Sequence, residues 1–170
     1  MSYPWRIKAL THWGSGTFSH IGFVRGDYSG RGLKKHLLFE ETISIASREA
    51  IDIVDLPNLS RIDFRGDYLL KSLIDNWWAE NYTQPPFISI EVDQVDTCKE
   101  MVINGLGYGI LASRILKDIE ELYKIDLTDQ KGNPILHRTW MYYHKESLEW
   151  NVVKAFVNFI ATLESQREVL

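Results

Sequence analysis

Hydrophobic residues along the chain change their spacing several times, and each change predicts a different element. A short apolar run at 21–24, IGFV, is stopped by Arg25-Gly26-Asp27, which is typical of a strand buried on both faces of a parallel sheet. Residues 37–39 and 43–46 are extended in pattern, with the adjacent acids Glu40 and Glu41 between them, which would point apart on a strand. Further strands are predicted at 6–10, 61–64, 87–92, 108–111 and 139–143.

Helical spacing occurs in four other segments. Apolar residues from 69 to 78 share one face, with Asp67 as a possible N-cap, and we expect Trp77 and Trp78 to divide between core and surface. Asp93 is a second possible N-cap, for a helix that stops at Asn104-Gly105. The other two helices are predicted at 113–123 and 148–163, and Pro57 is predicted to lie in a loop. This alternation of strands and helices predicts a mostly parallel α/β architecture.

Composition and charge narrow the class of protein. The chain has 170 residues, 45 % of them hydrophobic, and a net charge of −4, which argues against tight binding to a phosphate backbone. No apolar stretch reaches the roughly 20 residues that cross a bilayer, and the first residues do not resemble a signal peptide. A single cysteine, Cys98, excludes an intrachain disulfide. We therefore expect a cytoplasmic protein without membrane contact.

The sequence contains no recognisable motif for catalysis or for cofactor binding. Gly14-Ser15-Gly16 lacks the spacing of a nucleophile elbow, and Cys98 lies on the apolar stripe of its predicted helix, where packing is expected. The five histidines include no i, i+4 pair that would bind a metal ion. The glycines at 105–109 follow a helix and precede a strand, the reverse of a dinucleotide-binding loop. We predict no enzyme activity, metal site or cofactor.

Arg25 is the strongest single candidate for binding chemistry. It follows a predicted strand directly, and open α/β sheets bind ligands at the carboxyl ends of their strands. A guanidinium group at such a position suits a bidentate contact with a carboxylate. The residues alone leave open the alternative of a solvated arginine in a turn.

Three stretches together resemble the effector domain of LysR-type transcriptional regulators. Residues 92–113, VDQVDTCKEMVINGLGYGILAS, are similar to the family's helix that ends in a glycine-rich turn, although Ala112 replaces the usual proline. Residues 21–26 resemble its strand that ends in arginine, and 132–140 followed by the last predicted helix complete the order. Trp77-Trp78, 92–98 and 138–140 further resemble the citrate-responsive catabolite control protein C and E group of Gram-positive bacteria.

The resemblance implies a fold and a ligand site. The fold would be the type 2 periplasmic-binding fold, with two α/β subdomains joined by two crossover strands and the effector in the cleft. Subdomain I would comprise about 1–45 and 138–170, and subdomain II about 46–137. Two arginines would grip the ligand carboxylates, helped by hydroxyl donors and by the start of one helix in the second subdomain. By motif position the ligand-binding residues would be Arg25, Arg138, Thr11, Ser15, Gln94, Val95 and Thr97.

The implied function is effector sensing for a transcriptional regulator, with a small carboxylate such as citrate as the ligand. The full-length regulator would be a homodimer or homotetramer, and would reach DNA only through an N-terminal winged helix-turn-helix that this sequence does not contain. The family's first strand and helix are also expected to be missing here. The alternative is a free-standing solute-binding protein of the same fold, and a small α/β enzyme is a third and weaker hypothesis.

Overall fold

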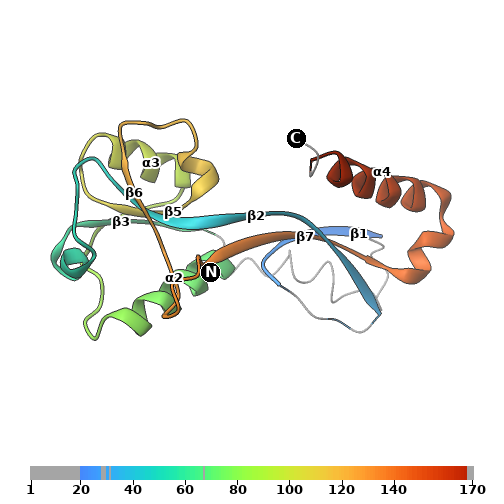
Figure 1. Cartoon of the computed structure of the whole chain (residues 1–170), viewed down its shortest axis with the longest axis horizontal. Coiled ribbons are helices and arrows are strands. Elements are labelled where there is room, and N and C mark those ends of the chain that lie inside the picture. Colours follow the sequence, from blue (N-terminus) through green and yellow to red (C-terminus); the bar gives the residue numbers. More distant parts are fainter. Residues whose placement is uncertain (1–19, 28–29, 31, 67, 168–170) are drawn as a thin grey trace. The chain divides into compact units, whose positions relative to one another are not determined.

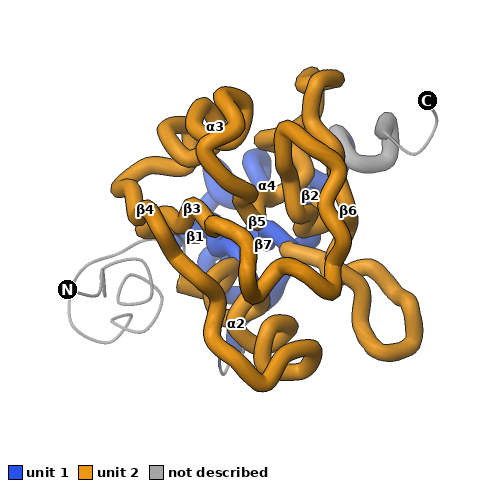
Figure 2. The backbone as a smooth tube through the Cα atoms, turned by 90° about the vertical axis from the view of Figure 1, so that its left-hand side faces the viewer, with its two compact units in different colours: residues 1–40, 138–170 blue, residues 41–137 orange. Residues whose placement is uncertain are grey.

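The computed structural model describes residues 20–27, 30, 32–66 and 68–167, with side chains described up to 162. The predicted strand at 6–10, the cap at Asp67 and the candidate ligands Thr11 and Ser15 lie outside these residues. The chain divides into two compact units, residues 1–40 with 138–170 and residues 41–137 (Figure 2). Two strands, β2 (Leu33–Ser47) and β7 (Leu136–His144), carry the chain from one unit to the other.

The first unit is built on an antiparallel pair of strands and one long helix. Strand β1 (Ile21–Arg25) runs antiparallel to β7, which pairs with β2 on its other side (Figure 1). The prediction of a parallel strand buried on both faces is therefore wrong for β1. Among the described residues β1 is an edge strand, and the side chain of Phe23 is 54 % exposed. A short 3-10 helix, η3 (Lys145–Glu149), leads from β7 into α4 (Asn151–Arg167).

Helix α4 has a buried stripe and an exposed apolar stripe. Val153 and Val157 pack against Met141 of β7, as the periodicity predicts. Phe156 and Phe159 are 37 % and 57 % exposed, and Phe156 meets Phe23 edge to face. The helix is shorter than predicted at its start because the predicted segment's first residues belong to η3.

The second unit contains strands of two sheets, with helices packed on them. Strands β5 and β6 both run antiparallel to β2, whereas β3 and β4 run parallel to each other. The prediction of a mostly parallel sheet is therefore wrong, although the fold is α/β: β1, β5 and β6 are paired antiparallel in one sheet, and β3 and β4 form a separate parallel pair. The bounds of the elements are η1 (Ile53–Asn58), β3 (Arg61–Phe64), α2 (Tyr68–Asn81), β4 (Ile88–Val92), α3 (Val95–Ile103), β5 (Gly109–Ala112), η2 (Ser113–Leu116) and β6 (Tyr123–Asp126).

The main hydrophobic core lies in this second unit. Trp77 and Trp78 are both buried there, at 3 % and 5 % exposed, which corrects the expectation that one would face solvent. Both indole N–H groups find carbonyl acceptors, Thr128 at 3.0 Å and Gln84 at 2.9 Å. Two buried indoles on adjacent positions of one helix are tolerated because each polar atom is paired.

Three local predictions in the second unit are wrong. The helix expected at 113–123 is only the 3-10 turn η2, after which the chain enters β6, a strand that the pattern did not predict. Asp93 does not cap α3, because Gln94 is the N-cap residue and its side chain makes no capping hydrogen bond. Pro57 lies in η1 rather than in a loop.

Gly107 is required by a close approach between two backbone segments. A Cβ atom at this position would lie 2.5 Å from the carbonyl oxygen of Ser60, and the residue has a φ of +157°. The approach is fixed by pairing, because the N–H of the next residue, Tyr108, donates to that same oxygen at 2.9 Å. A side chain at Gly107 would therefore push β3 away from the segment that enters β5.

We expect Gly107→Ala to lower the free energy of unfolding by about 2–5 kcal/mol, since a backbone clash adds to the cost of the backbone conformation. The control is Gly132→Ala, where φ is +83° but nothing lies within 4 Å of the new Cβ. That variant should lose only about 1–2 kcal/mol. Urea denaturation measures both, and equal losses would show that the close approach to Ser60 is unimportant.

Candidate ligand-binding site

The two predicted arginines stand at neighbouring positions in the first unit. Arg25 is the last residue of β1 and pairs with Thr139, and the N–H of Gly26 donates to the carbonyl oxygen of Arg138 at 2.6 Å. Because strand side chains alternate, Arg25 shares the face of Thr139 and Arg138 lies on the other face of β7. The structure thus brings the two backbones together where β1 ends.

The guanidinium group of Arg138 contacts an acid on the neighbouring strand. Its Nε atom donates to Oε2 of Glu40 at 3.0 Å, and the two side chains are 44 % and 45 % exposed. Pairs this open to water contribute little to stability, typically about 0.2–1 kcal/mol. The contact orients the Arg138 side chain, and breaking it costs little free energy.

Glu41, the next residue along β2, lies on the opposite, buried face of the strand. Its carboxylate is 5 % exposed, and Oε1 lies 3.7 Å from Nδ1 of the buried His137. Neither carboxylate oxygen accepts a hydrogen bond from a described residue. The prediction that Glu40 and Glu41 point apart is confirmed. The strands that link the units therefore carry one exposed and one buried acid–base pair, on opposite faces.

The start of α3 presents the other predicted ligand residues that the structure describes. Gln94 and Thr97 are exposed and Val95 is half-buried. The acids around this helix start have cationic partners: Asp93 lies 3.5 Å from Arg65, and Asp96 lies 3.4 Å from Lys99. The free N–H groups of the first turn remain available to an anion. These residues belong to the second unit.

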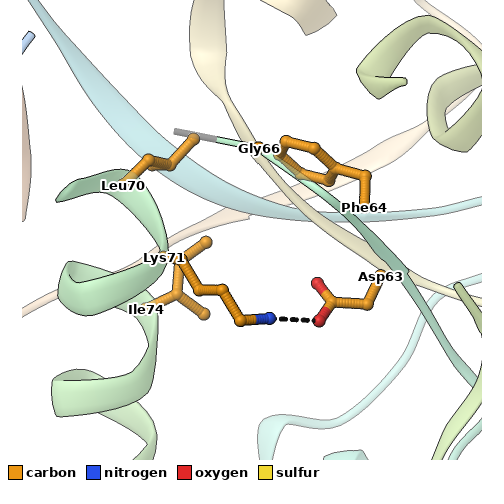
Figure 3. A pocket seen from close by; sticks show the side chains of 6 residues that line it. All are labelled: Asp63, Phe64, Gly66, Leu70, Lys71 and Ile74. Atoms are coloured by element: carbon orange, nitrogen blue, oxygen red, sulfur yellow. Dashed lines mark hydrogen bonds and ion pairs between the residues drawn. The ribbon is translucent and has the colours of Figure 1, made fainter. Parts of the chain in front are cut away.

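A small pocket in the second unit, with an ion pair among mostly apolar lining residues, was not predicted from the sequence. Figure 3 shows the Asp63 carboxylate facing the amino group of Lys71 across the pocket, at 2.7 Å. The lining residues are Asp63, Phe64, Gly66, Leu70, Lys71 and Ile74. On its other oxygen Asp63 accepts from Arg61 at 3.1 Å, and the Arg61 side chain is only 2 % exposed. The sequence signal that could have predicted this ion pair is the spacing of Arg61 and Asp63, which are two residues apart on one strand.

The charges of this pocket set the ionisation of its groups. Burial alone would raise the pKa of Asp63, but the hydrogen bond from Lys71 and the charges of Arg61 and Lys71 outweigh it and hold the pKa below its usual value. Burial, followed by the charge of Asp63, raises the pKa of Cys98 to about 12. The thiol therefore stays protonated near neutral pH, and the predicted packing role of Cys98, which is fully buried, is confirmed.

We expect Asp63→Asn to lower the free energy of unfolding by about 3–5 kcal/mol, because Arg61 would remain buried without a counter-charge. The depressed pKa means that the unfolded chain takes up the proton first as pH falls. Stability is therefore present above the ordinary carboxyl pKa of about 4 and is lost on acidification, and the variant should lose less over that range. Chemical denaturation from pH 7 to pH 3 measures both effects.

The control for this prediction is Asp96→Asn, which removes an exposed carboxylate paired with Lys99. It should change the unfolding free energy by less than about 1 kcal/mol. If Asp63→Asn behaves like this control at neutral pH, the buried charges do not depend on each other.

Comparison with known families and chains gives a consistent set of matches. Residues 19–164 match the family model described as the LysR substrate binding domain. The chain is 39 % identical over 140 residues to the uncharacterized HTH-type transcriptional regulator YraN of Bacillus subtilis (strain 168), covering 82 % of this chain and 48 % of that protein. It is 32 % identical over 170 residues to YkuM of the same strain, covering 95 % and 58 %. The chain thus spans about half the length of these relatives.

Solved structures show the same fold. The regulatory domain of HypT from Salmonella typhimurium, in a bromide ion-bound form, superposes with a TM-score of 0.72 at 14 % identity, covering 98 % of this chain and 80 % of that one. Full-length BenM superposes with a TM-score of 0.64 at 15 % identity, covering 88 % and 52 %. Among the described residues, no helix is both long and apolar enough to cross a membrane.

Proposed function

This chain belongs to the LysR substrate-binding domain family, and we propose that it senses a small carboxylate such as citrate. The family supplies the effector-binding domain of LysR-type transcriptional regulators, which are not enzymes, and its fold is the periplasmic-binding-protein-like α/β fold. A place in the citrate-responsive catabolite control protein C and E group is part of the proposal, motivated by the motifs at 77–78, 92–98 and 138–140.

The observation that carries the carboxylate proposal is the placement of two arginines where β1 ends. Arg25 pairs with Thr139, and Arg138 is the adjacent residue of β7. Beyond Gly26 the edge of β7 is no longer paired with β1, so the long side chains of Arg25 and Arg138, which leave opposite faces of the sheet, both start beside this strand end. Guanidinium groups match carboxylates in geometry and charge, and two of them favour a ligand with more than one carboxylate.

The remaining ligand contacts are proposed from motif position. Gln94, Val95 and Thr97 would offer the first turn of α3, which has backbone N–H groups suited to an anion. Thr11 and Ser15, which lie outside the described residues, would supply hydroxyl donors.

The longer protein would use this domain to control DNA binding. We infer a cytoplasmic regulator, active as a homodimer or homotetramer, in which effector binding here shifts an equilibrium between two arrangements of the subunits. The names of YraN and YkuM as HTH-type transcriptional regulators support this inference. An effector can shift such an equilibrium only through a difference in its affinity for the two states.

Citrate should raise the thermal midpoint of the chain if the proposal is right. Ligand at a hundred times its Kd adds about 2.7 kcal/mol to the free energy of unfolding. Arg25→Ala and Arg138→Ala should each weaken binding about 10- to 100-fold, because each removes charge-assisted hydrogen bonds. Differential scanning fluorimetry and titration calorimetry measure the two effects.

The matched control is Arg48→Ala, which removes an exposed arginine that donates to the carbonyl oxygen of Ile103 in the second unit. Its affinity for citrate should equal that of the unaltered chain. The proposal is wrong if millimolar citrate and other di- and tricarboxylates leave the thermal midpoint unchanged, or if all three variants bind equally.

A further inference from the structure

We propose that Glu40 is an internal competitor for the effector: its carboxylate occupies Arg138 until an effector carboxylate displaces it. The inference rests on the proposed function and adds a residue that determines affinity and ligand class at the same site. The supporting contact is the hydrogen bond from Arg138 Nε to Glu40 Oε2 at 3.0 Å. A carboxylate already in place shows which chemistry this guanidinium group accepts.

The contact is open enough to be exchanged. Both side chains are nearly half exposed, so water and small solutes reach the pair. An ion pair in that environment is weak because solvent and salt screen it. Arg138 therefore need not be unfolded or unpacked to take a new partner. A ligand that offers a two-pronged contact forms a stronger interaction than the Nε contact that Glu40 makes.

Glu40 is singled out among the acids near Arg138. Glu41 lies on the other face of β2, with its carboxylate buried beside His137. Asp27, two residues after Arg25, is bound by the amino group of Lys35 at 2.6 Å and lies within 3.4 Å of the Tyr142 hydroxyl. Those two carboxylates already have other neighbours, whereas Glu40 contacts the predicted ligand residue itself.

Competition of this kind selects the ligand class. A monocarboxylate such as acetate offers one group of the same chemistry as Glu40, but it lacks the advantage of being tethered beside Arg138. A di- or tricarboxylate offers Arg138 more than one group, so a second carboxylate stays at high effective concentration when the first is released. The structure thus favours polycarboxylates over monocarboxylates beyond what two arginines alone would give.

Displacement would also act on the strand that links the units. Glu40 is the last residue of the first unit and Glu41 is the first residue of the second. Losing the Glu40 contact removes a side-chain tie between β2 and β7 at the point where both strands pass between units. Effector binding would therefore loosen β2 from β7 within the first unit as well as fill a site.

The test is a double-mutant cycle on citrate binding, measured by titration calorimetry at low salt with the 170-residue chain. Glu40→Gln should bind citrate about two- to fivefold more tightly than the unaltered chain, since an exposed ion pair is worth that much. In the Arg138→Ala background the same change should give no gain. The gain in citrate affinity from Glu40→Gln should shrink as salt is raised from about 0.01 M to 1 M, because salt screens the ion pair that the substitution removes.

Glu80→Gln provides the matched control, because it removes one exposed carboxylate on α2 and so changes the net charge equally. It should leave the affinity unchanged. Acetate should bind the Glu40→Gln variant with a larger relative gain than citrate, because it lacks a second group with which to compete. Circular dichroism verifies that each variant is folded before its affinity is compared.

Three outcomes would overturn the inference while leaving carboxylate sensing in place. These are citrate binding that Glu40→Gln does not tighten, a gain that persists in Arg138→Ala, and an equal gain in Glu80→Gln. If neither the unaltered chain nor Glu40→Gln binds any di- or tricarboxylate, both the proposed function and the inference are wrong.

Discussion

The pairing of β2 with its neighbours is the constraint on which the other elements depend. β2 has 15 residues, about three times the usual length of a strand, and it belongs to both units. Residues 43–47 of this strand pair with β5 and β6. Its pairing with β7 joins it to β1, and so to Arg25 and Arg138. Both units are therefore built in part on the same continuous strand.

Two ion pairs of the chain have different roles because their exposure to solvent differs. Arg61 and Asp63 are buried, and removing one would leave the other in a medium that solvates charge poorly. Arg138 and Glu40 form a contact of similar length, but both side chains are nearly half exposed to solvent. The first pair is a fixed part of the core, whereas the second can change partners. Exposure, more than distance, separates structural from exchangeable ion pairs here.

The sequence pattern located most elements but not how they pair. β1, β3, β4, α2 and α3 lie where the spacing of apolar residues predicts them, because that spacing reflects local burial. β6 was missed since only its pairing with β2, far away in sequence, makes it a strand. Arg25 was found from its position directly after a strand, and Arg138 through a family motif. The Glu40 partner was out of reach, because it lies 98 residues from Arg138 and no local pattern links them.

The adjacent acids of β2 give this strand an unusual sensitivity to length. A one-residue insertion or deletion in β2 before Glu40 would move each later side chain of the strand to the opposite face of the sheet. Glu40 would move to the face on which Glu41 is now buried, and Glu41 would replace it on the face where Glu40 is now exposed. Substitutions on this strand change one contact at a time, whereas a change of length alters every contact at once. Evolution of this domain can therefore vary the composition of β2 far more freely than its number of residues.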